Sequence, residues 1–140
     1  MTVILRVNSK SNCFLLEMNM YDSIGKFSER TGLSRYTLRY YEKENLIKPN
    51  RHKNGHRYYT EHDVNWVLFI KKLKDTNMPI KQIKQYALLR ERGDITLEER
   101  MLLLQHHQRF VLETVANWQG HLNNLNEKID FYRKKISSLR

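Results

Sequence analysis

The chain has 140 residues, of which 25 are Lys or Arg and 15 are Asp or Glu, so its formal net charge is +10. This length allows one compact domain, or a small domain with an appendage. The excess positive charge favours a polyanionic partner, nucleic acid before an acidic membrane surface, with solvated surface lysines as the alternative explanation.

The cysteine content and hydropathy restrict the remaining classes. The single cysteine, Cys13, excludes an internal disulfide framework and a metal site built from clustered cysteines. No apolar run reaches the roughly 20 residues that a membrane span needs, and no secretory signal sequence is present. We therefore expect a cytoplasmic protein without a membrane partner.

The start of the chain contains short apolar patches that lack helical periodicity. We therefore interpret residues 1–20 as a poorly ordered N-terminal extension, and Met18 and Met20 are both plausible native starts. An extra strand or helix packed on the domain is the alternative, and the sequence leaves it open.

Two short helices are expected next. Ser23 is a good N-cap for a helix ending near Arg30, and Ser34 caps a second helix after the turn at residues 31–33. This is the spacing of a helix-turn-helix, which presents its second helix to the DNA major groove. An ordinary corner between two helices has the same spacing.

The second helix carries two different faces. At 3.6 residues per turn, Leu38 and Tyr41 lie on one side. The other side carries a stripe of basic and aromatic residues, namely Arg35, Tyr36, Arg39, Tyr40 and Lys43. Guanidinium groups suit phosphates and guanine edges, and phenols suit phosphate oxygens, so this stripe is suited to DNA.

A basic loop follows over residues 49–59. It contains Asn54-Gly55, a strong signal for a two-residue hairpin turn. We interpret the loop as a small β-ribbon, or wing, that brings Arg51, Lys53 and Arg57 to the surface of the second helix. A solvated basic loop is the alternative.

Two further helices complete the predicted domain, which spans residues 21–92. Thr60 is the expected N-cap of the first, with Asp63 at its N3 position, and its run over residues 64–70 is almost continuously apolar. Pro79 is expected at the N1 position of the next helix. The expected buried residues are Trp66, Phe69, Leu73, Ile80, Ile83 and Ala87.

A long helix is predicted over residues 95–140, beginning at a capping box formed by Thr96 and Glu99. Its apolar residues repeat at alternating spacings of four and three, with Gln108 as a polar insertion. Such a repeat indicates a left-handed coiled coil. A helix this long cannot bury its seam against so small a domain, so we expect a second copy; folding back on its own domain is the alternative. The predicted dimerisation residues are Leu104, Val111, Val115, Trp118, Leu122, Leu125, Ile129, Tyr132 and Ile136.

No catalytic pattern is evident. The six histidines lack the spacing of metal ligands, and neither a phosphate-binding glycine-rich loop nor a nucleophile elbow is present. We therefore predict no enzyme activity, cofactor or metal site.

The motifs fit together as one pattern. Its parts are Ile24-Gly-Lys-Phe-Ser28, Thr31-Gly-Leu-Ser34, Thr37-Leu-Arg-Tyr-Tyr-Glu42, Leu46-Ile47, Pro49, Asn54-Gly-His-Arg-Tyr58 and Asp63-Val64. This pattern closely resembles the MerR family of bacterial transcription regulators, over about residues 20–139. Residues 90–100 look like the short stress- and aldehyde-responsive branch of that family.

The resemblance implies a mainly α fold: a winged helix-turn-helix DNA-binding domain and a long C-terminal helix that forms an antiparallel coiled coil. It implies a homodimer that binds double-stranded DNA at an inverted repeat and distorts an overlong promoter spacer, so that RNA polymerase engages both promoter elements. The DNA-binding residues predicted with it are Ser34, Arg35, Tyr36, Thr37, Arg39, Tyr40, Arg51, Asn54, Arg57 and Tyr58.

One departure concerns the signal. The chain has no cysteine after Cys13, so the cysteine chemistry of metal-sensing and electrophile-sensing members does not transfer. The effector is unassigned. Two rival functions remain at this stage: a non-specific architectural DNA-binding protein, and a coiled-coil adaptor that binds protein.

Overall fold

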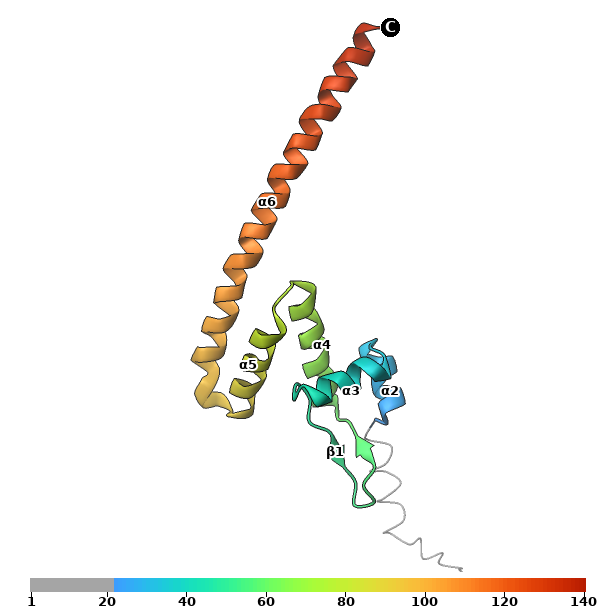
Figure 1. The fold of residues 1–140 in the computed structure, drawn as a ribbon, viewed down its shortest axis with the longest axis vertical. Coiled ribbons are helices and arrows are strands. Elements are labelled where there is room, and N and C mark those ends of the chain that lie inside the picture. The colour runs from blue at the N-terminus through green and yellow to red at the C-terminus, as the bar shows by residue number, and fades with distance from the viewer. Residues whose placement is uncertain (1–21) are drawn as a thin grey trace, which may run out of the picture. The chain divides into compact units, whose positions relative to one another are not determined.

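The computed structural model describes residues 22–140, and the predicted extension over residues 1–20 lies outside them. The described chain is mainly helical (Figure 1), which confirms the predicted fold class. Its elements are α2 (Ile24–Thr31), α3 (Arg35–Lys43), β1 (Asn50–Arg51), β2 (Arg57–Tyr58), α4 (Glu61–Asp75), α5 (Ile80–Glu91), the 3₁₀ turn η1 (Asp94–Thr96) and α6 (Leu97–Ser138).

The chain forms two compact units that divide between Ala87 and Leu88, inside α5. The first unit contains the two strands and α2 to α4, and the second contains η1 and α6. The predicted functional division into residues 21–92 and 95–140 stays a prediction.

The core of the first unit lies among α2, α3 and α4. Phe27, Val67 and Ile70 are fully buried, and the ring of Phe27 stacks on that of Tyr59 with centroids 4.1 Å apart. Of the residues predicted to be buried, Trp66, Leu73, Ile83 and Ala87 are buried, whereas Phe69 and Ile80 are half-buried. Leu38 and Tyr41, on one side of α3, are buried as well. The apolar face of α3 therefore belongs to this core.

The predicted helix ends of the helix-turn-helix are confirmed. Ser23 Oγ accepts the N–H of Lys26 at 3.3 Å, and Ser34 Oγ accepts the N–H of Thr37 at 3.1 Å. Gly32 ends α2 in the left-handed conformation at φ 70°, where a Cβ would be unfavourable.

A polar network joins the wing to α4. Thr60 and Asp63 form the predicted capping contact, since Asp63 Oδ2 accepts the N–H of Thr60 at 2.9 Å and Thr60 Oγ1 accepts the N–H of Asp63 at 3.3 Å. The same Oδ2 also accepts the Asn50 Nδ2–H at 3.0 Å. The carboxylate of Asp63 thus fixes both the start of α4 and the first residue of β1.

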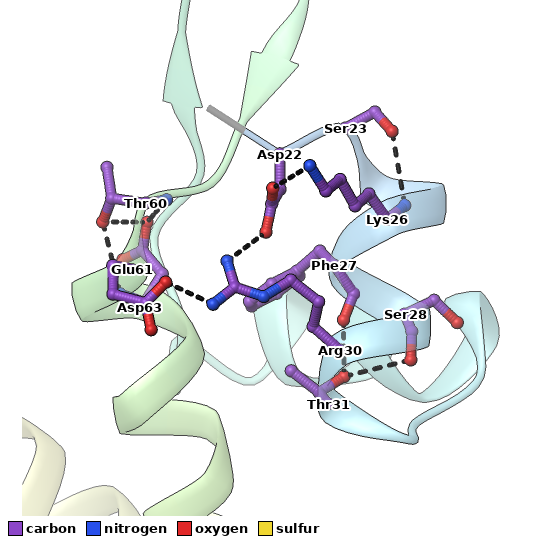
Figure 2. Close-up of polar contacts among 10 residues, drawn as sticks. All are labelled: Asp22, Ser23, Lys26, Phe27, Ser28, Arg30, Thr31, Thr60, Glu61 and Asp63. Atoms are coloured by element: carbon purple, nitrogen blue, oxygen red, sulfur yellow. Dashed lines mark hydrogen bonds and ion pairs between the residues drawn. The ribbon is translucent and has the colours of Figure 1, made fainter. Parts of the chain in front are cut away.

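A second cluster, centred on Arg30, joins α2 to the residues around β2 and α4 (Figure 2). Arg30 Nη1 donates to Asp22 Oδ2 at 2.7 Å, and Nη2 donates to Glu61. These hydrogen bonds, with that to Glu61 the larger cause, raise the pKa of the Arg30 guanidinium. The backbone of Asp22 pairs with Tyr59 through N–H···O contacts of 2.8 and 2.9 Å, so three segments meet at this point.

Three sequence-based details are wrong. The wing turn is longer than Asn54-Gly55: the N–H of Gly55 donates to His52 O and that of His52 to His56 O, so Lys53, Asn54 and Gly55 form the loop. Asn54 keeps a negative φ and only Gly55 is left-handed, as in a type I turn followed by a bulge.

The other two details concern helix starts. α5 begins at Ile80, so Pro79 precedes the first helical residue instead of occupying it. Thr96 does not cap α6 with its side chain. Its buried hydroxyl instead lies as donor 2.6 Å from Leu89 O and 2.8 Å from Gly93 O, which prevents the capping box with Glu99.

The capping contact at Thr60 gives the first testable prediction. Thr60→Ala removes the hydroxyl that accepts the N–H of Asp63, and we expect it to lower the free energy of unfolding by about 1 kcal/mol. Urea unfolding followed by circular dichroism measures the change. The matched control is Thr114→Ala in the interior of α6, where the exposed hydroxyl only bonds to Phe110 O and its loss should be close to neutral. Equal effects of the two substitutions would contradict the role of the cap.

Candidate nucleic-acid interface

Helix α3 presents the predicted stripe to solvent. Arg35, Tyr36, Arg39, Tyr40 and Lys43 are all exposed, Tyr36 to 83%. The opposite face is anchored in the core by Leu38 and Tyr41, which are each 1% exposed. Burial of that apolar face fixes the rotation of α3 and with it the outward direction of the stripe.

The start of α3 is held by hydroxyl groups. Ser34 Oγ caps the helix and lies 2.9 Å from Thr37 Oγ1. Ser34 is exposed and Thr37 half-buried. Ser34 and Thr37, both predicted as DNA contacts, therefore stabilise the start of α3 and also lie beside the stripe.

The lack of a side chain at Gly25 in α2 leaves room for the side chain of Arg35. A Cβ added at Gly25 would lie 2.8 Å from Arg35 Nη2 and 3.8 Å from Ser23 Oγ. The guanidinium of Arg35 therefore lies against the first turn of α2. Sequence reasoning missed Gly25, and its position in the first turn of a helix, where glycine is unfavourable, was the available signal.

The wing strands pair antiparallel, with Asn50 opposite Tyr58 and Arg51 opposite Arg57. The loop beyond them holds its own side chains in place. Arg51 Nη1 donates to Gly55 O at 2.8 Å, and Asn54 Oδ1 accepts the N–H of His56 at 3.0 Å. These contacts stiffen an exposed loop that has no core of its own.

An ion pair joins the wing to α3. The Nε and Nη2 atoms of Arg57 donate to Glu42 Oε1 at 3.2 and 2.9 Å. The Arg57 side chain is 43% exposed and that of Glu42 21% exposed. Arg57 was predicted as a DNA contact, and in the structure its side chain links β2 to the end of α3. Glu42 was missed as a site residue.

Tyr58 and Tyr59 have different environments. The ring of Tyr58 is half-buried and packs against His52 with centroids 4.3 Å apart. Tyr59 is buried, and its burial, followed by the negative charge of Glu42, raises the pKa of its phenol. Tyr58 is thus the wing tyrosine that lies near the surface, whereas Tyr59 remains neutral in the core.

Within residues 22–140, no three His, Cys, Asp or Glu side chains come together in a way that could hold a metal ion. No helix in that part of the chain is long and apolar enough to cross a membrane. Cys13 lies outside the described residues.

Comparison with known proteins places the chain. Residues 23–89 match the family described as MerR HTH family regulatory protein. An uncharacterised HTH-type transcriptional regulator of Haemophilus influenzae is 39% identical over 111 residues, which are 78% of this chain and 82% of the relative. The chain belongs to the MerR family.

Solved structures agree with this assignment. HiNmlR, a MerR family regulator lacking the sensor domain and crystallised with promoter DNA, has a TM-score of 0.71 and 36% identity, with 82% of this chain and 92% of that chain covered. A MerR family regulator from Bacillus thuringiensis has a TM-score of 0.67 and 31% identity, with 79% and 97% covered. As a member of the MerR family, this chain is a DNA-binding transcriptional regulator.

The ion pair between Glu42 and Arg57 leads to the second prediction. Glu42→Gln should cost at most about 1 kcal/mol of stability, since the pair is partly exposed to solvent. It should nevertheless increase the hydrogen exchange of the β2 amides several-fold, because the wing loses its tie to α3. Exchange followed by NMR tests this. Glu29→Gln, which removes the same charge from the exposed face of α2, is the control, and equally fast wing exchange in both variants would rule out the tie.

Proposed function

We propose that this MerR protein binds an inverted-repeat promoter site as a homodimer and controls transcription there by distorting an overlong spacer. The observation that carries the proposal is the exposed arginine and tyrosine stripe of α3, next to a wing that is tied to α3 by Glu42 and Arg57. The promoter-DNA complex of the similar protein HiNmlR supports it.

In this proposal α3 reads the major groove. Arg35 and Arg39 are one helical turn apart and both exposed, so their guanidinium groups can address guanine edges or adjacent phosphates. Tyr36 and Tyr40, 83% and 40% exposed, supply phenol donors for phosphate oxygens. Ser34 and Thr37 are proposed to contact the backbone at the helix start.

The wing is proposed to contact the flanking phosphates. Arg51 and Arg57 each keep part of their guanidinium for DNA, since each is exposed beyond its internal contact. Asn54 uses its carboxamide oxygen within the loop, which leaves its NH₂ group as the donor to a phosphate. Tyr58 completes the set from β2. Phosphate contacts of this kind position a protein on the duplex without reading sequence.

The second copy is inferred from α6, which spans about 63 Å at 1.5 Å per residue. Its seam is bare in the protomer: Trp118 is 69% and Leu125 63% exposed. Leaving such a seam in water costs roughly 25 cal/mol per Å² of apolar surface, which a second copy removes. The proposed dimer contacts are Leu104, Val111, Val115, Trp118, Leu122, Leu125, Ile129, Tyr132 and Ile136.

The charges of α6 favour an antiparallel pair. Residues 127–140 carry five basic and two acidic side chains, whereas residues 97–113 carry three acidic and two basic ones. A parallel coiled coil would set Lys128 opposite Arg133 and Lys135 opposite Arg140 on its flanks. The antiparallel arrangement instead places the basic end of each helix beside the acidic start of the other.

Two reading heads joined in this way would bind half-sites about one helical turn apart. Bending and untwisting the DNA between them uses its sequence-dependent deformability. This distortion is proposed to let RNA polymerase engage both promoter elements. The assignment to the stress- and aldehyde-responsive branch stays a prediction from residues 90–100.

Arg39→Ala tests the reading role of α3. If Arg39 contacts a base, we expect binding to weaken by about 1–3 kcal/mol, with relaxed specificity at one position of each half-site. Titration of operator variants in the presence of random competitor DNA measures both effects. Lys134→Ala removes the same charge from an exposed position of α6 and should change neither. An Arg39→Ala protein with unchanged affinity and sequence preference would refute the assignment.

Leu125→Asp tests the dimer. A carboxylate in the seam should convert the protein to a monomer, because a buried unpaired charge costs several kcal/mol, and binding to the inverted repeat should fall with it. Sedimentation equilibrium and DNA titration are the measurements. Asn123→Asp adds the same charge at an exposed position outside the seam and should remain dimeric. A Leu125→Asp protein that sediments as a dimer would disprove the proposed interface.

A further inference from the structure

The seam of α6 consists of two interleaved series of exposed or half-buried residues. Their alternating spacings of three and four define the a and d positions of a heptad. The a positions are Met101, Gln108, Val115, Leu122, Ile129 and Ile136, and the d positions are Leu97, Leu104, Val111, Trp118, Leu125, Tyr132 and Leu139. Gln108 and Tyr132 are the members of this seam with an amide and a hydroxyl group.

An antiparallel pair sets each a residue against a d residue of the other copy, and registers differ by steps of one heptad. Two registers give the longest overlap, with six kinds of layer each. In the first, Gln108 faces Tyr132 of the second copy. In the second, Gln108 faces Leu125 of the second copy, and Tyr132 faces Met101 of the second copy.

The two polar side chains distinguish these registers. An amide and a phenol can hydrogen-bond to each other, so the first register satisfies both, twice per dimer by symmetry. In the second register they face apolar side chains, and each buried polar group without a partner weakens association about tenfold or more. The second register does pair the large Trp118 with the small Val115. In a two-stranded coil, however, side chains at the open flanks can adjust to a less favourable size match, whereas a buried amide cannot make up for a missing hydrogen bond. The polar contact should therefore outweigh the size match.

The protomer leaves both groups available for such a contact. Gln108 is exposed and Tyr132 is 53% exposed. The ring of Tyr132 already has neighbours that restrict it: Lys128 Nζ lies 5.3 Å from its centroid and the ring of Phe131 meets it edge-on at 5.5 Å. A restrained ring loses less side-chain entropy when its hydroxyl forms a bond.

We propose that two copies of α6 pair in the first register, in which a hydrogen bond between Gln108 of one copy and Tyr132 of the other selects the alignment. This inference rests on the homodimer proposed above. The two-fold axis then passes near Gly120. The layers from the ends to the centre are Met101–Leu139, Leu104–Ile136, Gln108–Tyr132, Val111–Ile129, Val115–Leu125 and Trp118–Leu122.

The alignment also places charges on one flank. The residues that follow each d position meet their counterparts of the second copy, and in the first register Glu98 lies beside Arg140 and Gln105 beside Arg133. Both contacts bring a basic side chain to an acceptor. Exposed pairs of this kind add little energy, so the polar layer inside the seam is the decisive contact.

A distance measurement tests the register directly. A spin label at Lys134→Cys, in a Cys13→Ser background, occupies an exposed position outside the seam. In the first register it lies level with residue 106 of the second copy, an axial separation of about 42 Å, and in the second it lies level with residue 99, about 53 Å. A parallel pair would bring the labels within about 25 Å, since helix axes lie about 10 Å apart.

Double electron–electron resonance distinguishes these outcomes. A distance distribution that matches the first register supports the proposal. A distribution that matches the longer separation of the second register, or the short separation of a parallel pair, overturns the register while leaving the homodimer intact. A spectrum without dipolar modulation means a monomer, which overturns the homodimer and the register together.

A mutant cycle tests the selecting contact. Tyr132→Phe should raise the dimer dissociation constant about tenfold or more when Gln108 is present, because the amide loses its partner. In a Gln108→Leu background the same change should matter less than about threefold. Sedimentation at several concentrations measures both. Equal effects of Tyr132→Phe in the two backgrounds would overturn the proposed hydrogen bond.

Discussion

Burial of the apolar face of α3 is the constraint on which the orientation of its arginine and tyrosine stripe depends. Leu38 and Tyr41 are almost completely covered, and Lys74 from α4 lies 5.3 Å from the ring centroid of Tyr41. A helix held along one face cannot rotate without exposing those side chains, at roughly 2 kcal/mol for each large apolar group. The arginine and tyrosine stripe therefore faces solvent because the opposite face of the same helix is buried.

The wing depends on a different kind of contact. A ribbon with two residues in each strand has no core, and a lone hairpin is marginally stable in water. Three ties compensate: Arg57 to Glu42 of α3, Asn50 to the carboxylate of Asp63, and the backbone pair of Asp22 with Tyr59. Each tie connects the wing to a helix end or to the stacked pair of Phe27 and Tyr59. The stripe of α3 and the wing are consequently supported by the same set of helices.

Local and periodic features were predictable because short-range physics decides them. The N-caps at Ser23, Ser34 and Thr60 depend on a hydroxyl within three residues of a free N–H. The buried positions follow the helical period, and the seam of α6 follows the heptad period. The family itself was recognisable from contiguous motifs, and comparison confirmed it.

The sequence by itself therefore determined the helices, the outward stripe of α3 and membership of the MerR family. Only the tertiary structure decided that Glu42 pairs with Arg57, fifteen residues away, that Asp63 also bonds to Asn50, and that Arg35 lies against Gly25. It likewise turned the hydroxyl of Thr96 toward carbonyl oxygens instead of the expected cap. Such contacts form between segments that are distant in the sequence and adjacent in the fold. Local sequence patterns do not specify which distant segments become adjacent.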